Sequence, residues 1–111
     1  MSQPDLFEDG ASEDPAAREA LVERWFALTR ERLPALAKTN DWPVSEDHCF
    51  MRILLDNTCG GVWRDFVKAP AYRHAPSEVL ERAIALGEAV ERGEADVWAL
   101  NARSLAWRGK A

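Results

Sequence analysis

Apolar side chains recur at helical spacing in four segments of the chain, and no segment alternates with a period of two over four or more residues. This pattern predicts an all-α fold, a small bundle of four main helices plus one or two short helices, with no sheet. Each long segment is bounded by residues typical of helix ends. We expect the helices to run from Pro15 to about Arg32, from Glu46 to Gly60-Gly61, from Ser77 to Gly93, and from Asp96 to Gly109.

Prolines and polar residues mark where these helices should begin and end. Asp14, Ser45, Ser77 and Asp96 are expected to cap the four helix N-termini. Pro34 is expected to interrupt the first helix, because proline lacks the backbone N–H and clashes with the preceding turn. A short helix should follow it, and a second short helical turn is expected around residues 62–67. Residues 68–76 are expected to form a loop bounded by prolines.

The charge of the chain is concentrated at its N-terminus. The whole chain has a formal net charge of −5, and residues 1–14 contain five acids and no base. The positive and negative charges of residues 15–111 are therefore equal in number. We predict a disordered acidic tail over residues 1–14 and a single helical domain over residues 15–111. Removing the tail should change the free energy of unfolding by less than about 1 kcal/mol.

The composition of the domain indicates a cytoplasmic protein. No apolar run approaches the roughly 20 residues that a membrane span needs, and the N-terminal residues do not resemble a signal peptide. Cys49 and Cys59 are therefore expected to be reduced. The five tryptophans are expected to supply much of the core, with Trp98 and Leu105 facing it together from the last helix.

The second helix carries a polar stripe on an otherwise apolar surface. His48, Arg52 and Asp56 are spaced four residues apart, so they share one face over two turns. One interpretation is structural: Arg52 and Asp56 form ion pairs with each other or with neighbouring helix ends, and His48 caps a carbonyl. The other is functional: Arg52 binds an anion or a partner carboxylate with its planar donor fork, and His48 assists.

Residues 48–76 are the one part of the domain with a local excess of positive charge. This excess is too small for double-stranded nucleic acid, which needs a dense basic face, but it suits a small anion or an acidic protein segment. Arg64 follows a glycine pair that lets backbone amides approach an anion. Tyrosine and arginine are favoured at contact surfaces. We expect an opening shared by Arg52 and the loop around Tyr72, and the candidate binding residues are His48, Arg52, Asp56, Arg64, Tyr72, Arg73 and His74.

Two catalytic alternatives receive little support from the spacing. A zinc site would need the side chains of His48, Cys49, Cys59 and His74. Their spacing in the sequence lacks the closely spaced ligand pairs that zinc sites use. Cys59 lies at the end of a helix, where the negative end of the dipole should raise the thiol pKa. We therefore predict no metal and no cofactor, and no catalytic residue is identified.

Residues 43–110 contain a pattern of three segments, DHCFMRILLDNTCGGVW, PAYRH and ALNARSLAWRGK. It resembles a group of short, largely uncharacterised bacterial proteins, which are sometimes classed as GNAT-type N-acetyltransferases. The resemblance implies a bacterial origin and raises acetyl transfer as a possible activity. That fold rests on a mixed sheet and on a Gln/Arg-x-x-Gly-x-Gly/Ala loop for the cofactor pyrophosphate, and the chain has no such loop.

Three functions follow from these observations. The first is a small cytoplasmic binding or adaptor protein, with an arginine- and histidine-lined contact site for an acidic partner or a small anion. The second is an acyltransferase-like enzyme or its accessory subunit, using the same residues. The third is a single-stranded nucleic-acid binding module, in which tryptophans would stack on bases beside arginines.

Overall fold

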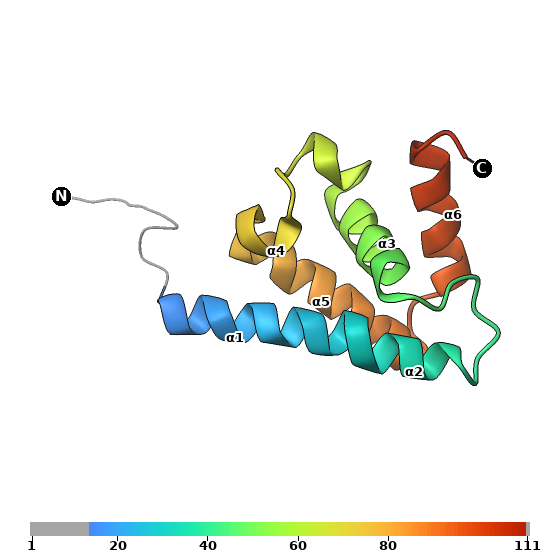
Figure 1. Cartoon of the computed structure of the whole chain (residues 1–111). Coiled ribbons are helices and arrows are strands. Elements are labelled where there is room, and N and C mark those ends of the chain that lie inside the picture. The colour runs from blue at the N-terminus through green and yellow to red at the C-terminus, as the bar shows by residue number, and fades with distance from the viewer. Residues whose placement is uncertain (1–13, 111) are drawn as a thin grey trace.

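The computed structural model describes residues 14–110, which form helices and contain no strand. The predicted all-α fold with four main helices is confirmed for this part of the chain. Helices α5 and α6 and the turn η2 pack against α3, α1 packs against α5, and α6 stands at one end of the bundle (Figure 1). Their bounds are α1 Pro15–Phe26, α3 Asp47–Cys59, α5 Ser77–Glu91 and α6 Val97–Trp107. The predicted disorder of the tail concerns residues 1–13, which lie outside the described residues.

The first helix does not stop at Pro34, so the predicted interruption is wrong. Helix α1 continues without a break into a π-helical turn, η2 (Ala27–Arg32), and then into α2 (Leu33–Ala37), which gives the long rod along the lower edge of Figure 1. The N–H of Leu33 bonds to the carbonyl of Leu28, five residues back. A π turn is wider than an α turn, and here it lies directly before Pro34, where an α-helix would meet the proline ring.

Two of the four predicted caps are confirmed. Asp14 accepts a hydrogen bond from the N–H of Ala16 at 3.1 Å, and Asp96 accepts one from the N–H of Trp98 at 2.9 Å. The serine caps are wrong. Helix α3 begins at Asp47, two residues after Ser45. Ser77 is the first residue of α5, and its hydroxyl oxygen accepts a hydrogen bond from Arg18 instead.

The segments between the long helices contain two further helical turns. A 3₁₀ turn, η3 (Trp63–Asp65), confirms the short helix expected around residues 62–67. The segment expected to be a loop over residues 68–76 contains a short helix, α4 (Ala71–His74), which follows directly after Pro70. Proline at the residue before a helix has the fixed φ that helix starts require.

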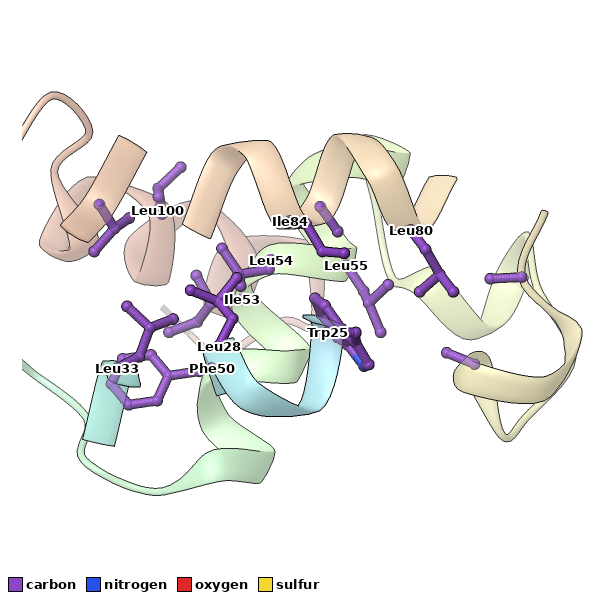
Figure 2. Packing of buried hydrophobic residues seen from close by; sticks show 14 of the residues in the cluster. Trp25, Leu28, Leu33, Phe50, Ile53, Leu54, Leu55, Leu80, Ile84 and Leu100 are labelled. Atoms are coloured by element: carbon purple, nitrogen blue, oxygen red, sulfur yellow. The ribbon is translucent and has the colours of Figure 1, made fainter. Parts of the chain in front are cut away.

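The core lies where α3 meets α5 and the rod of α1, η2 and α2. Figure 2 shows large side chains from these elements packed together, with Leu28 and Leu54 meeting near the centre. The predicted buried stripe of α5 is confirmed at Leu80, Ala83, Ile84, Gly87 and Val90. Gly87 allows the close approach of its neighbours, because a Cβ there would lie 2.5 Å from Cδ2 of Leu28 and 3.0 Å from Cδ1 of Leu54.

The prediction that tryptophans supply much of the core holds for three of the five, since Trp42 and Trp63 also pack against the core from partly buried positions, and it is wrong for the other two. Trp25 is buried, with 1% of its surface exposed, but Trp98 and Trp107 are 52% and 40% exposed. Trp98 lies at the edge of the bundle, where its indole N–H donates to the carbonyl of Asp41 at 2.8 Å. An indole N–H needs such a partner, and so tryptophan often lies at the boundary between core and solvent.

Within the described part of the chain, no helix combines the length and apolar character needed to cross a bilayer.

Candidate functional site

A buried carboxylate connects α3 to α6 and to the turn that follows α3. Asp56 has no exposed surface. Its Oδ2 accepts hydrogen bonds from Nε of Arg108 and from the Ser104 hydroxyl, both at 2.7 Å. Its Oδ1 accepts from Nη2 of Arg108 and from the backbone N–H of Trp63, both at 3.0 Å. The carboxylate is thus fully satisfied by charged and neutral donors, as a buried charge must be.

These donors determine the protonation of Asp56. Burial by itself would raise the pKa of the carboxyl group, because it disfavours the charged form. The hydrogen bonds from Arg108, Ser104 and Trp63, together with the positive charge of Arg108, outweigh burial and lower the pKa below its ordinary value of 3.8. The Asp56 carboxylate in turn raises the pKa of Arg108. Asp56 is therefore ionised at neutral pH and holds one arginine in a fixed position.

Of the two pairings considered for the structural interpretation, the direct Arg52–Asp56 pair is wrong, whereas pairing with a neighbouring helix end is found for Asp56, which binds Arg108 at the end of α6. Arg52 donates from Nη1 to the Ser104 hydroxyl at 2.7 Å and from Nη2 to the Asn101 side-chain oxygen at 3.0 Å. It reaches Asp56 only through Ser104, since that hydroxyl donates onward to the carboxylate. Residues four apart on a helix lie close enough to pair, but the facing helix α6 supplies better-placed partners to both side chains.

Three arginines and one histidine surround a surface hollow beside this network. The hollow has a volume of about 340 Å³ and is called the arginine hollow below; it is lined by His48, Met51, Arg52, Trp63, Arg64 and Arg108. The lining therefore contains three guanidinium groups and no carboxylate. Acids outside the lining act on these groups: Asp56 binds Arg108, the charge of Asp65 also acts on Arg108, and Glu46 and Asp47 lie beside His48.

Arg64 differs from the other two arginines of the hollow. It is exposed, and its guanidinium carbon lies 5.3 Å from the ring centroid of Trp63. It forms no hydrogen bond or ion pair with any other residue of the range 14–110. All five of its N–H donors therefore remain available. His48 lies at the rim with 72% of its side chain exposed, within 3.5 Å of Glu46 and 3.7 Å of Asp47.

A second hollow adjoins the first and has a different chemistry. It has a volume of about 300 Å³ and is called the aromatic hollow below. Phe26 and Tyr72 form one side of it, with ring centroids 5.3 Å apart, and the Arg30 guanidinium lies 3.8 Å from the centre of the Phe26 ring. The two hollows share three lining residues, Met51, Trp63 and Arg64. The turn η3 therefore forms part of both.

The predicted candidate residues are only partly brought together. His48, Arg52 and Arg64 line the arginine hollow, and Tyr72 lines the aromatic hollow next to it. Arg73 and His74 are exposed on α4 and line neither hollow. The predicted opening shared by Arg52, Tyr72, Arg73 and His74 is therefore wrong in this form. Successive residues of a helix point about 100° apart, so the short helix α4 turns these two side chains away when Tyr72 faces Phe26.

Sequence reasoning missed several contributors to the site. Arg108 and Ser104 bind Asp56 from α6. From the sequence alone, a cation and a hydroxyl group near the end of a helix have an ordinary explanation, so neither residue was predicted to belong to the site. Their spacing of four residues matches the spacing of Arg52 and Asp56, which is the one signal in the sequence that could have paired the two helices. Phe26 and Arg30 carried no such signal, because their hollow depends on the uninterrupted rod of α1, η2 and α2.

The cysteines and acidic groups offer no catalytic arrangement among residues 14–110. Both cysteines are free thiols, and burial together with the charge of Asp56 raises the pKa of Cys59. The pKa of Cys59 is thus shifted upward, as predicted, but the largest cause is burial and not the helix dipole on which the prediction was based. In this part of the chain no group of three or more His, Cys, Asp or Glu residues is arranged to hold a metal ion.

A third hollow, of about 360 Å³, lies at the other end of the bundle and is acidic. Asp41, Glu91 and Asp96 line it together with Trp42 and Trp98, and it has no basic lining residue. The charged lining residues of this hollow are therefore opposite in sign to those of the arginine hollow. No protein-family model, no curated protein and no solved structure matches the chain.

Proposed function

We propose that this protein is a small binding module that holds an anionic group, a carboxylate of an acidic partner or a small anion, in the arginine hollow. The observation that carries this proposal is the unpartnered guanidinium of Arg64 beside two arginines held in place by the Asp56 network. A binding site gains affinity when its groups are ordered before the ligand arrives.

The fixed arginines retain donors for a ligand. Arg52 uses one hydrogen from each terminal nitrogen on Ser104 and Asn101, and Arg108 uses Nε and Nη2 on Asp56. A guanidinium has five N–H donors, so both groups can still donate toward the hollow. Carboxylate and phosphate oxygens are the acceptors that fit paired arginine donors best.

We place this module in the cytoplasm, on the basis of its two free cysteines. The acyltransferase alternative receives less support, since the mixed sheet of the GNAT-type fold has no counterpart among residues 14–110. The nucleic-acid alternative would need a run of exposed aromatic side chains beside cations. The exposed Trp98 instead lines the acidic hollow.

The experiment that tests this proposal is a titration with two simple anionic probes, inorganic phosphate and the peptide acetyl-Gly-Ser-Glu-Ser-Gly-amide. We expect saturable shifts of the Trp63 and Arg64 side-chain N–H signals by NMR, with a dissociation constant on the order of 1 mM. Arg64→Gln should weaken binding at least about fivefold. Arg82→Gln is the matched control, because Arg82 is an exposed arginine that lines neither hollow. Equal binding by both variants would contradict the proposal.

A further inference from the structure

We infer that the partner is a peptide segment in which a large apolar side chain, best an aromatic one, lies within one or two residues of the acidic side chain. This inference rests on the proposed function: the acidic group occupies the arginine hollow, and the apolar group occupies the aromatic hollow. The protein would thus recognise a short acidic–aromatic segment of another protein.

The contact between the two hollows is the first step. Met51, Trp63 and Arg64 line both, so a group bound in one hollow lies directly beside the other. In an extended peptide, side chains two residues apart point to the same side and are separated by roughly 7 Å. A ligand with an anion alone would leave the adjoining apolar surface exposed to water.

The lining of the aromatic hollow is the second step. The lining combines the partly exposed rings of Phe26, Trp63 and Tyr72 with the buried Trp25. Tyr72 remains 37% exposed, so covering it removes apolar surface from water at roughly 25 cal/mol per Å². Arg30 and Arg64 border the same hollow. Their guanidinium groups favour an aromatic ring, whose π faces attract cations, over an aliphatic chain.

The exposure of the lining is the third step, and it favours a peptide over a small molecule. Sites for small ligands usually bury most of the ligand surface. Here the lining residues His48, Arg64 and Tyr72 are all exposed, so the two hollows form a shallow pair on the outside of the bundle. Such a surface suits neighbouring side chains of a peptide, each anchored in its own hollow.

The test compares three fluorescein-labelled peptides on the full chain by fluorescence polarisation. The probes are Gly-Glu-Ser-Phe-Ser-Glu-Gly, in which each glutamate lies two residues from the phenylalanine, the same peptide with serine in place of phenylalanine, and the same peptide with glutamine in place of both glutamates. We expect the first peptide to bind at least about tenfold more tightly than either of the others.

The outcomes separate this inference from the proposed function. If the serine peptide binds as tightly as the phenylalanine peptide, and both bind more tightly than the glutamine peptide, the inference fails while the proposed function stands. If the glutamine peptide binds as tightly as the first peptide, the proposed function itself fails. Residues 5–9 of the chain read DLFED and have the same chemistry. The ranking of the three peptides is therefore also measured on the full chain with the double substitution Leu6→Ser and Phe7→Ser. The inference requires the same ranking on this variant.

A pair of variants assigns the preference to the aromatic hollow. Tyr72→Ser should abolish most of the preference for the phenylalanine peptide over the serine peptide. Trp107→Ser is the matched control, since Trp107 is similarly exposed at 40% and lines neither hollow. A preference that survives Tyr72→Ser in a folded protein, as judged by circular dichroism, would overturn the inference. If that variant does not fold, the three-peptide ranking on the unaltered chain decides.

Discussion

Helix α3 packs against α5 on one face and against α6 on another, and the two contacts are built from opposite chemistries. Toward α5 it presents Leu54, which meets Leu28 and Gly87 in the closely packed core. Toward α6 it presents Arg52, Asp56 and Asn57, and each forms at least one hydrogen bond to that helix. The same thirteen-residue helix thus joins an apolar contact to a polar one.

The difference shows which contact makes the fold and which makes the site. Apolar burial is non-directional and drives folding, whereas a buried ion pair gives little net stability over an apolar replacement. Hydrogen bonds are directional, so the polar contact fixes where Arg52 and Arg108 lie. We interpret the α3–α6 contact as the element that positions cations at the surface.

The largest expected effect comes from removing the central carboxylate of the polar contact. Asp56→Ala should lower the free energy of unfolding by about 3–5 kcal/mol, because Arg108, Ser104 and the Trp63 N–H lose their common acceptor. Urea denaturation followed by circular dichroism measures this change. Glu81→Ala, at an exposed position of α5 outside this network, is the control and should change stability by less than about 0.5 kcal/mol.

The second effect is a dependence of this loss on pH. The pKa of Asp56 is lowered in the native protein, so the unfolded chain takes up a proton first as the pH falls. The stabilisation by Asp56 should be complete near pH 6. It should begin to decrease as the pH approaches the ordinary value of 3.8 and be lost as the pH falls through the native pKa. The stability difference between the unaltered chain and Asp56→Ala, measured from pH 7 to pH 2, should shrink accordingly. A difference that stays constant would contradict the account.

A smaller effect tests the apolar contact. Gly87→Ala places a methyl group against Leu28 and Leu54. Overpacking of this kind typically costs about 1–3 kcal/mol, and the better helix propensity of alanine returns up to about 1 kcal/mol. We expect a net loss of about 1 kcal/mol that, unlike the loss in Asp56→Ala, does not depend on pH. An increase in stability would show that Leu28 moves aside freely.

The smallest expected effect on stability belongs to the residue that matters most for the proposed binding. Arg64→Gln should change the free energy of unfolding by less than about 0.5 kcal/mol, because its side chain is exposed and has no hydrogen-bond or ion-pair partner among residues 14–110. Thermal unfolding of Arg64→Gln beside Arg82→Gln measures this. A loss above 1 kcal/mol in Arg64→Gln alone would assign Arg64 a structural role.

The helices could be predicted from the sequence because their signals are local. The apolar stripe of α5, the caps at Asp14 and Asp96, and the end of α3 at Gly60 all follow from residues within a few positions of one another. The continuation past Pro34 could not be predicted in this way. The packing of Leu28 and Leu33 on α3 and α5 stabilises the rod within the π turn and directly after it.

The site was predictable only where its residues lie on one helix. His48, Arg52 and Asp56 could be grouped by spacing, but the partners of the last two come from α6, about fifty residues later in the chain. Nothing local distinguishes Arg108 from a cation placed at a helix end for its dipole. Arg73 and His74 were grouped with Tyr72 because they are adjacent in sequence. In the structure these residues lie on a short helix, and its turn points their side chains in different directions.

The most direct test of the proposed binding uses the indole N–H signals of the five tryptophans as reporters. Trp63 lines both the arginine and the aromatic hollow, and Trp42 and Trp98 line the acidic hollow at the other end. Nitrogen-15 NMR spectra are recorded as Gly-Glu-Ser-Phe-Ser-Glu-Gly is added to the full chain. The account predicts a saturable shift of the Trp63 signal while those of Trp42 and Trp98 stay in place. A shift of Trp42 and Trp98 with Trp63 unmoved would contradict it.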